Sequence, residues 1–275
     1  MLVILLGEID VSVASTMALS SVVMGMLYGA GETGIPMWVA VLAALAVGCI
    51  CGFINGIILV NFKELSSVIV TIATMIIFRG IAQILLETNS VGGFAPWFRF
   101  LNYGVIGGIP LGILLFAIEA AVFGYVIHKT AFGRKVFAMG KNITTAAYSG
   151  VRTDRIRLLI FTLNGLFAAV AGLFAASKMS SVLPSMARNY ELEVISIVVL
   201  GGVSTLGGTG NVIGVLLSTL SIGMLRYGLG LAGVNSQTIL VIVGLMLIIA
   251  VALPNLKKSF GSNGLINKFT KSKLR

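Results

Sequence analysis

Long apolar stretches alternate with short polar ones along the chain, and this spacing predicts a helical membrane protein. The apolar stretches lack the period-two alternation of barrel strands, and most approach the roughly 20 residues that a bilayer-spanning helix needs. We therefore expect an all-α fold, a polytopic transmembrane helical bundle with about eight spans. The expected segments are 1–30, 37–62, 65–86, 109–128, 156–177, 190–200, 212–229 and 237–253.

Polar or glycine-rich residues interrupt two of these segments. GEIDVSVAS, residues 7–15, places carboxylates and hydroxyls inside an apolar run, which predicts a broken helix beside a polar pathway. The alternative is that the chain starts near the interface and both carboxylates lie among headgroups. The second break covers 190–211, where a short run ends in GGVSTLGGTGN. Because this motif lacks the Lys and Ser/Thr of a phosphate-binding loop, we expect a re-entrant or tightly packed turn. Its glycines are Gly201, Gly202, Gly207, Gly208 and Gly210.

The longest polar interruption, AFGRKVFAMGKNITTAAYSGVRTDRIR, covers residues 131–157. It predicts a short helix, because Asn142 can accept from the first free backbone amides and Gly150 can take the left-handed conformation that ends a helix. Apolar residues at helical spacing form a narrow stripe between and just beyond them. Such a helix at the membrane surface is suited to docking on a partner. The residues assigned to it are Asn142, Ile143, Ala146, Ala147, Gly150 and Val151.

Composition supports a membrane protein and argues against a soluble one. Of the 275 residues, 57% are hydrophobic and 10% are charged, and the mean hydropathy is +1.06. A soluble domain carries about 25% charged residues. The net charge of +10 does not indicate nucleic-acid binding, because the basic residues cluster beside apolar runs as orientation signals do.

The distribution of basic residues predicts the orientation. Eight crossings place Lys63, the loop 129–157 and the basic tail 257–275 on one side, and these hold most of the 19 Lys and Arg residues. By the positive-inside rule that side is cytoplasmic, so both termini are expected there. We divide the chain into a transmembrane domain, 1–256, which includes the cytoplasmic loop 129–157, and a basic cytoplasmic tail, 257–275. The apolar start, without a charged leader, predicts no cleavable signal peptide.

Few residues suggest chemistry of their own. Polar amides within or beside the spans, Asn55, Asn61, Asn164 and Gln83, are suited either to joining helices or to lining a polar path. Glu119 is central in its segment and is interpreted as a structural acid, with proton coupling as the alternative. Cys49 and Cys51 have no second pair to form a zinc site, and His128 has no nucleophile nearby. We expect no catalytic residue and no metal site. The candidate pathway residues are Asp10, Ser12, Asn55 and Asn164.

Three motifs together resemble one family. GEIDVSVAS, the polar stretch 131–157 and YELEVISIVVLGGVSTLGGTGNVIG occur in the order found in permease subunits of bacterial ABC importers for sugars, in the branch that includes ribose, rhamnose and autoinducer-2 permeases. The resemblance covers nearly the whole chain. Ala146, Ala147 and Gly150 match the EAA…G loop of importers, with Thr145 in place of its leading Glu.

The resemblance implies an import subunit rather than an enzyme. Residues 142–150 would be the coupling helix that docks on ABC ATPase subunits, and ATP and Mg would bind to those subunits while this chain binds no cofactor. Further implied partners are a second permease subunit, identical or different, an extracytoplasmic sugar-binding protein and membrane lipid. The implied location is the bacterial cytoplasmic (inner) membrane.

Other readings of the sequence stay open. A secondary transporter would use Glu8, Asp10 or Glu119 for proton coupling, and a branched-chain amino-acid ABC permease would have a similar loop. A membrane scaffold would need neither the broken helix nor the glycine turn. Family members also have about one more helix before the segment that contains residues 7–15. We therefore expect that the start of this chain is placed too late, that the chain is trimmed, or that the helix is dispensable.

Overall fold

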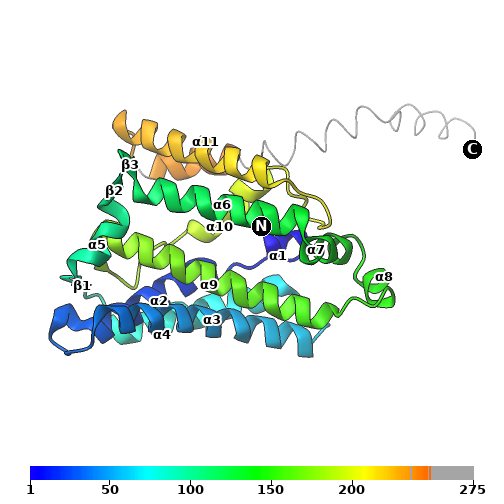
Figure 1. Ribbon diagram of the computed structural model, residues 1–275, viewed down its shortest axis with the longest axis horizontal. Coiled ribbons are helices and arrows are strands. Elements are labelled where there is room, and N and C mark those ends of the chain that lie inside the picture. Colours follow the sequence, from blue (N-terminus) through cyan, green and yellow to red (C-terminus); the bar gives the residue numbers. More distant parts are fainter. Residues whose placement is uncertain (236, 247, 249–275) are drawn as a thin grey trace, which may run out of the picture. The chain divides into compact units, whose positions relative to one another are not determined.

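A computed structural model describes residues 1–235, 237–246 and 248 (Figure 1). It divides into two compact units. The first contains Met1–Leu192 together with Ser204–Gly210, and the second contains Glu193–Val203 and continues from Asn211. The whole of the predicted tail, 257–275, lies outside the described residues, as does the end of the last predicted segment.

Among the described residues, five helices are long and apolar enough to cross a membrane. They match five predicted segments within a few residues, which confirms a polytopic helical membrane protein. The count of about eight stays a prediction, because the first segment is split and the sixth is a helix of only 11 residues. The last segment is described only as the apolar helix Gln237–Met246. The five helices are α3 (Met37–Asn61), α4 (Ser67–Leu86), α6 (Leu111–Lys129), α9 (Thr153–Met179) and α11 (Val212–Leu231).

The first segment is broken, as the sequence predicts. Helix α1 (Leu2–Leu5) is followed by an unwound stretch, and α2 (Val13–Tyr28) then ends in a single 3₁₀ turn, η1 (Gly29–Gly31). Gly7 has φ +78°, so the chain turns away from the helical path there without a Cβ penalty. The break therefore spans the very motif in which the carboxylates occur.

Helices α2, α3, α4 and α9 form the core of the first unit (Figure 1). The backbones of α3 and α9 approach closely through glycines: a Cβ on Gly165 would collide with the carbonyl oxygen of Gly48, and one on Gly52 with that of Phe161. Small residues permit such close packing where lipid supplies no hydrophobic driving force between helices. Glycines thus allow α3 and α9 to pack with their backbones in close contact.

Two connections contain more structure than the sequence predicts. The loop 87–108 holds α5 (Pro96–Tyr103), where Pro96 occupies the first turn and Phe98 is fully buried while Trp97 is exposed. Within it β1 (Val91–Gly92) pairs antiparallel with β4 (Ser181–Val182) from the linker after α9. A hairpin joins β2 (Val105–Ile106) to β3 (Ile109–Pro110).

The polar stretch contains two helices where one is expected. Helix α7 (Ala131–Lys141) precedes the predicted short helix, α8 (Ile143–Tyr148). Thr130 caps α7, since its hydroxyl accepts from the Gly133 amide at 3.4 Å. Gly133, Val136 and Met139 are buried, so α7 is amphipathic and packs on the bundle with its basic residues outside.

The second unit pairs α10 (Tyr190–Leu200), which begins in the first unit, with α11. The Ser218 hydroxyl donates to the Ile197 carbonyl at 2.7 Å, and the Arg226 guanidinium donates to Glu193 Oε1 at 2.6 Å. A Cβ on Gly214 would collide with the carbonyl oxygen of Gly201. Polar pairs and a glycine contact therefore hold these two helices together.

Candidate functional site

Hydroxyl groups of α4 satisfy the backbone of the broken segment. The Ile9 amide donates to the Ser67 hydroxyl at 3.2 Å, and the Val11 amide donates to the Thr71 hydroxyl at 3.1 Å. An unwound stretch buried in a bundle needs such partners, because unpaired backbone groups away from water are costly. The break is a built feature of the fold.

All four candidate pathway residues meet in one hydrogen-bonded network beside this break. Asp10 Oδ1 accepts from the Ser12 amide at 2.8 Å and from the Ser12 hydroxyl at 2.7 Å, and Asp10 Oδ2 accepts from Asn164 Nδ2 at 2.8 Å. Asn55 Nδ2 donates to the Ser12 hydroxyl oxygen at 2.8 Å. Asp10, Ser12 and Asn55 are buried. The network joins the start of α2 to α3 and α9, so these amides do connect helices.

A second polar contact reaches the break from α9. Arg157 forms an ion pair with Glu8 at 2.6 Å and also donates to the Leu59 carbonyl at the end of α3 at 2.6 Å. The two charged side chains are only 11% and 15% exposed. Sequence reasoning treats Arg157 as one orientation charge among several. Arg157 differs from the other basic residues because it follows Ile156, within the first turns of an apolar span. A charged residue at such a place usually has a specific polar partner.

Helix α8 has the ends that the sequence predicts. The Asn142 side chain accepts from the Thr145 amide at 2.8 Å, and Gly150 has φ +82°. The Gly150 amide donates to the Ala147 carbonyl and the Val151 amide to the Ala146 carbonyl, which closes the C-terminal end.

The surface of α8 differs from the expected stripe. Ala146 is buried and Val151 half-buried, whereas Ala147 is exposed and Ile143 is 48% exposed. The sequence reasoning does not single out Tyr148, which is 90% exposed. Figure 1 shows α8 projecting beyond α7 and the start of α9. A small capped helix thus presents an isoleucine and a tyrosine outward.

Part of the predicted glycine turn packs against both the break and α7. The Gly208 amide donates to the Leu5 carbonyl at 2.8 Å. A Cβ on Gly207 would lie 2.6 Å from the Gly7 nitrogen, and one on Gly140 would collide with the Leu5 carbonyl. This arrangement, the glycine junction of Gly7, Gly140, Gly207 and Gly208, lies entirely in the first unit and packs backbone against backbone.

The other turn glycines have separate environments. Gly201 packs against α11 within the second unit, and Gly202 has φ +84° with no neighbour within 4 Å of a built Cβ. Gly210 is half-buried and directly precedes Asn211, whose side chain caps α11 by accepting from the Ile213 amide at 3.0 Å. Gly207 and Gly208 therefore pack against the break and α7, whereas Gly201 packs against α11.

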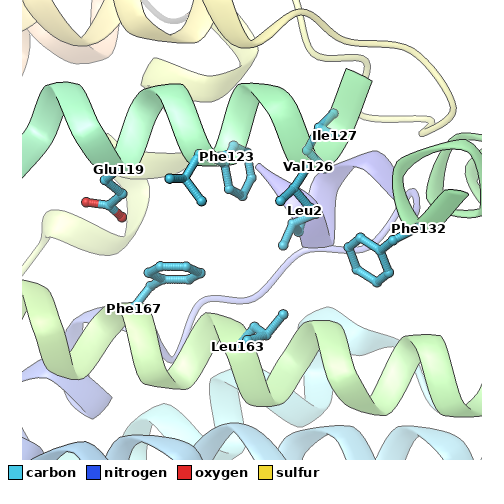
Figure 2. A pocket seen from close by; sticks show the side chains of 9 residues that line it. Leu2, Glu119, Phe123, Val126, Ile127, Phe132, Leu163 and Phe167 are labelled. Carbon is cyan, nitrogen blue, oxygen red and sulfur yellow. The ribbon is translucent and has the colours of Figure 1, made fainter. Parts of the chain in front are cut away.

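Glu119 lies away from these polar contacts. It lines an apolar cavity of about 190 Å³ between α6 and α9. Figure 2 shows Glu119 and Phe123 on α6 opposite Leu163 and Phe167 on α9. Neither the network at Asp10 nor the ion pair at Glu8 includes it.

Comparison with known proteins identifies one family. Residues 1–251 match the family described as the branched-chain amino acid transport system permease component. The chain is 36% identical over 260 residues to the ribose import permease protein RbsC of Bacillus subtilis (strain 168), covering 94% of this chain and 79% of that protein.

Two further relatives come from Escherichia coli. Identity is 33% to RbsC of strain K12, over 94% of this chain and 80% of that protein. The chain is also 33% identical to the autoinducer 2 import system permease protein LsrD of strain SMS-3-5 / SECEC, over 91% of this chain and 76% of that protein. No solved structure matches the chain.

Proposed function

The chain belongs to this permease component family, and from that premise we propose that it is the membrane-spanning subunit of an ATP-driven ABC importer for a monosaccharide or a sugar-like solute. The names of its relatives support a sugar over a branched-chain amino acid, because they are import permeases for ribose and autoinducer 2. The observation that carries the proposal is α8, a capped and outward-facing helix between two helices of the bundle.

In this proposal α8 is the contact for an ATPase subunit, through the exposed residues Asn142, Ile143, Ala147, Gly150 and also Tyr148. Ala146 is buried and Val151 half-buried, and they pack this helix against the rest of the chain. ATP and Mg bind to the ATPase, and this chain binds neither. A second permease subunit completes the pathway, and an extracytoplasmic binding protein delivers the solute. The complex lies in the bacterial cytoplasmic membrane with both termini of this chain cytoplasmic, in accord with the basic residues near α7 and α8.

Movement of α8 has two routes to the broken segment. One passes through α9, where Arg157 contacts Glu8 and Asn164 contacts Asp10. The other passes through α7, where Gly140 packs against Leu5 and Gly208. Closure of the ATPase subunits would shift α8 as a rigid body, and both routes would carry that shift to the pathway side of α2. The driving free energy comes from nucleotide binding to the partner.

The same contacts weigh against proton coupling at the break. Glu8 is held by Arg157, and Asp10 accepts three hydrogen bonds from Ser12 and Asn164. A carboxylate engaged in this way joins helices and needs no proton cycle. The rival secondary transporter would therefore rely on Glu119.

Reconstitution tests the proposal. We would co-purify the chain with the ATPase subunit encoded beside it and measure ribose uptake into proteoliposomes supplied with the binding protein. ATP-dependent uptake that survives collapse of the proton gradient is expected. Uptake by the chain alone, abolished by that collapse, would establish the secondary transporter instead.

Variants of α8 test the docking contact. Gly150→Glu adds bulk and charge at a left-handed position, whereas Gly150→Asn fills the same position with a residue that tolerates this conformation. Tyr148→Ala removes the exposed ring without touching the fold. We expect Gly150→Glu and Tyr148→Ala to lose ATPase capture and Gly150→Asn to keep it. Normal capture in the first two variants would show that α8 is not the docking helix.

A further inference from the structure

A polar groove lies in the first unit, remote from α8 along α4. Its volume is about 350 Å³, and it is lined by one face of α4 together with Arg188 of the linker after α9 and Glu191 of α10. The lining residues are Met75, Ile76, Arg79, Gly80, Gln83, Arg188 and Glu191. A guanidinium and an amide therefore face a second guanidinium and a carboxylate across an apolar floor.

The polar residues of α4 divide into two sets. Ser67, Thr71 and Thr74 are buried, and the first two bind the broken segment. Arg79 and Gln83 are one helical turn apart and therefore on one face, which is the face of the groove. A charge in an apolar span is costly, so such residues face polar or water-filled surroundings.

Arg79 also builds the groove. Its Nη1 atom donates to the Pro184 and Met186 carbonyls, both at 2.8 Å. These bonds fix the linker that carries Arg188 and leads into α10, where Glu191 lies. Gly80 adds space, because a Cβ built there meets nothing within 4 Å. The hydrogen bonds of Arg79 therefore hold one wall of the groove in place, and the lack of a side chain at Gly80 keeps the groove open.

One lining group has unused hydrogen-bonding capacity. Glu191 Oε2 is buried and has no hydrogen-bond partner among the described residues. Gln83, by contrast, is exposed to the groove and can both donate and accept. A buried carboxylate oxygen without a partner is costly, and a ligand hydroxyl would satisfy it.

We propose that this groove binds one ring of a polyhydroxylated solute on its way through the permease, with Gln83, Arg188 and Glu191 making the contacts. Neighbouring hydroxyls of a sugar donate to the Glu191 carboxylate and accept from the guanidinium and amide groups. The volume is at the lower end of the roughly 300–1,000 Å³ range of small-molecule sites, which fits a single ring. The inference rests on the proposed sugar importer and gives it a contact site.

Protection of a thiol tests this site directly. In a background carrying Cys49→Ala and Cys51→Ala, Gln83→Cys is reconstituted with the ATPase and treated with a charged thiosulfonate reagent. Saturating ribose should slow its modification at least fivefold. Ile84→Cys, 80% exposed on the same turn, is the matched control and reacts with an apolar maleimide at a rate that ribose leaves unchanged. Equal protection at both positions, or protection only by ribose 5-phosphate, would overturn the proposal.

Transport kinetics supply a second test that separates the two proposals. Glu191→Gln should raise the KM for ribose about tenfold with little change in maximal rate, whereas the exposed Arg99→Gln should leave KM unchanged. If the unmodified complex shows no ATP-dependent ribose uptake, the proposed function fails. If that complex transports ribose but neither Glu191→Gln nor ribose protection has an effect, only the groove assignment fails.

Discussion

Asn164 of α9 donates from Nδ2 to Asp10 Oδ2 at 2.8 Å, although 154 residues separate them in the chain. The bond ties the helix that follows α8 to the unwound stretch before α2. Because Asp10 is buried, loss of its amide partner leaves a carboxylate oxygen without a partner in a site that water reaches poorly.

Asn164→Ala should therefore lower the free energy of unfolding by about 1–3 kcal/mol. Thermal unfolding of the purified chain in detergent measures the change. Asn89→Ala is the control, because Asn89 is exposed in the turn after α4. Equal melting temperatures for the two variants would show that the amide bond contributes nothing to stability.

The Glu8–Arg157 ion pair should behave as a coupled unit. Glu8→Gln leaves Arg157 without its counter-charge in a nearly buried site, and we expect a loss of about 3–5 kcal/mol. The double variant Glu8→Gln/Arg157→Met should be more stable than Glu8→Gln alone, since no isolated charge remains. A double-mutant cycle in detergent tests this; additive losses would contradict the coupling.

An exposed ion pair at the start of α9 should contribute much less to the free energy of unfolding than the Glu8–Arg157 pair. Lys63 and Asp154 form an ion pair at 3.0 Å, but their side chains are 66% and 49% exposed. Exposed pairs of this kind contribute about 0–1 kcal/mol. Asp154→Asn should thus leave the melting temperature nearly unchanged, and a loss as large as that of Glu8→Gln would be inconsistent with the burial of the two sites.

The glycine junction predicts a contrast between two helical glycines. Gly140→Ala forces a methyl group against the Leu5 carbonyl and should destabilise the chain by about 1–3 kcal/mol through overpacking. Gly223→Ala in the middle of α11 meets nothing within 4 Å and should stabilise by about 0.5–1 kcal/mol. Unfolding curves of the two variants are the test, and similar shifts would argue against close packing at Gly140.

Capping of α8 should influence the ATPase contact. Asn142→Ala removes the bond to the Thr145 amide and costs about 1 kcal/mol of helix stability. Because that cost must be met again on docking, ATPase affinity should fall about fivefold. Asn142→Asp keeps the cap and should bind normally. Titration of detergent-solubilised complexes gives the dissociation constants, and unchanged affinity in Asn142→Ala would show that α8 is not pre-ordered for the partner.

Local signals in the sequence predict local structure well. Asn142 and Gly150 identify both ends of α8, and the polar motif at residues 7–15 identifies the break, because capping and glycine conformations depend on adjacent residues. The sequence does not predict α7, because its basic residues obscure a buried stripe of small and apolar side chains.

Long-range pairing could not be predicted in the same way. Asp10, Ser12, Asn55 and Asn164 were grouped only as polar residues in apolar runs, and nothing in their spacing shows which amide meets which oxygen. The role of Arg157 depends on where three separate segments meet, and only the fold shows this. Likewise, the sequence marks Gln83 as a polar amide, but the residues across the groove from it, in the linker after α9 and in α10, are far along the chain.

The close contact between α3 and α9 also has a mechanical consequence. Because Gly48, Gly52 and Gly165 bring backbone against backbone, the two helices cannot slide past each other without collision. They act as one stiff lever, whose end at Arg157 and Leu59 lies beside the unwound stretch. A movement of α8 would therefore turn this lever as a whole, and the bending would fall on residues 9–11, whose amides make no helical hydrogen bonds.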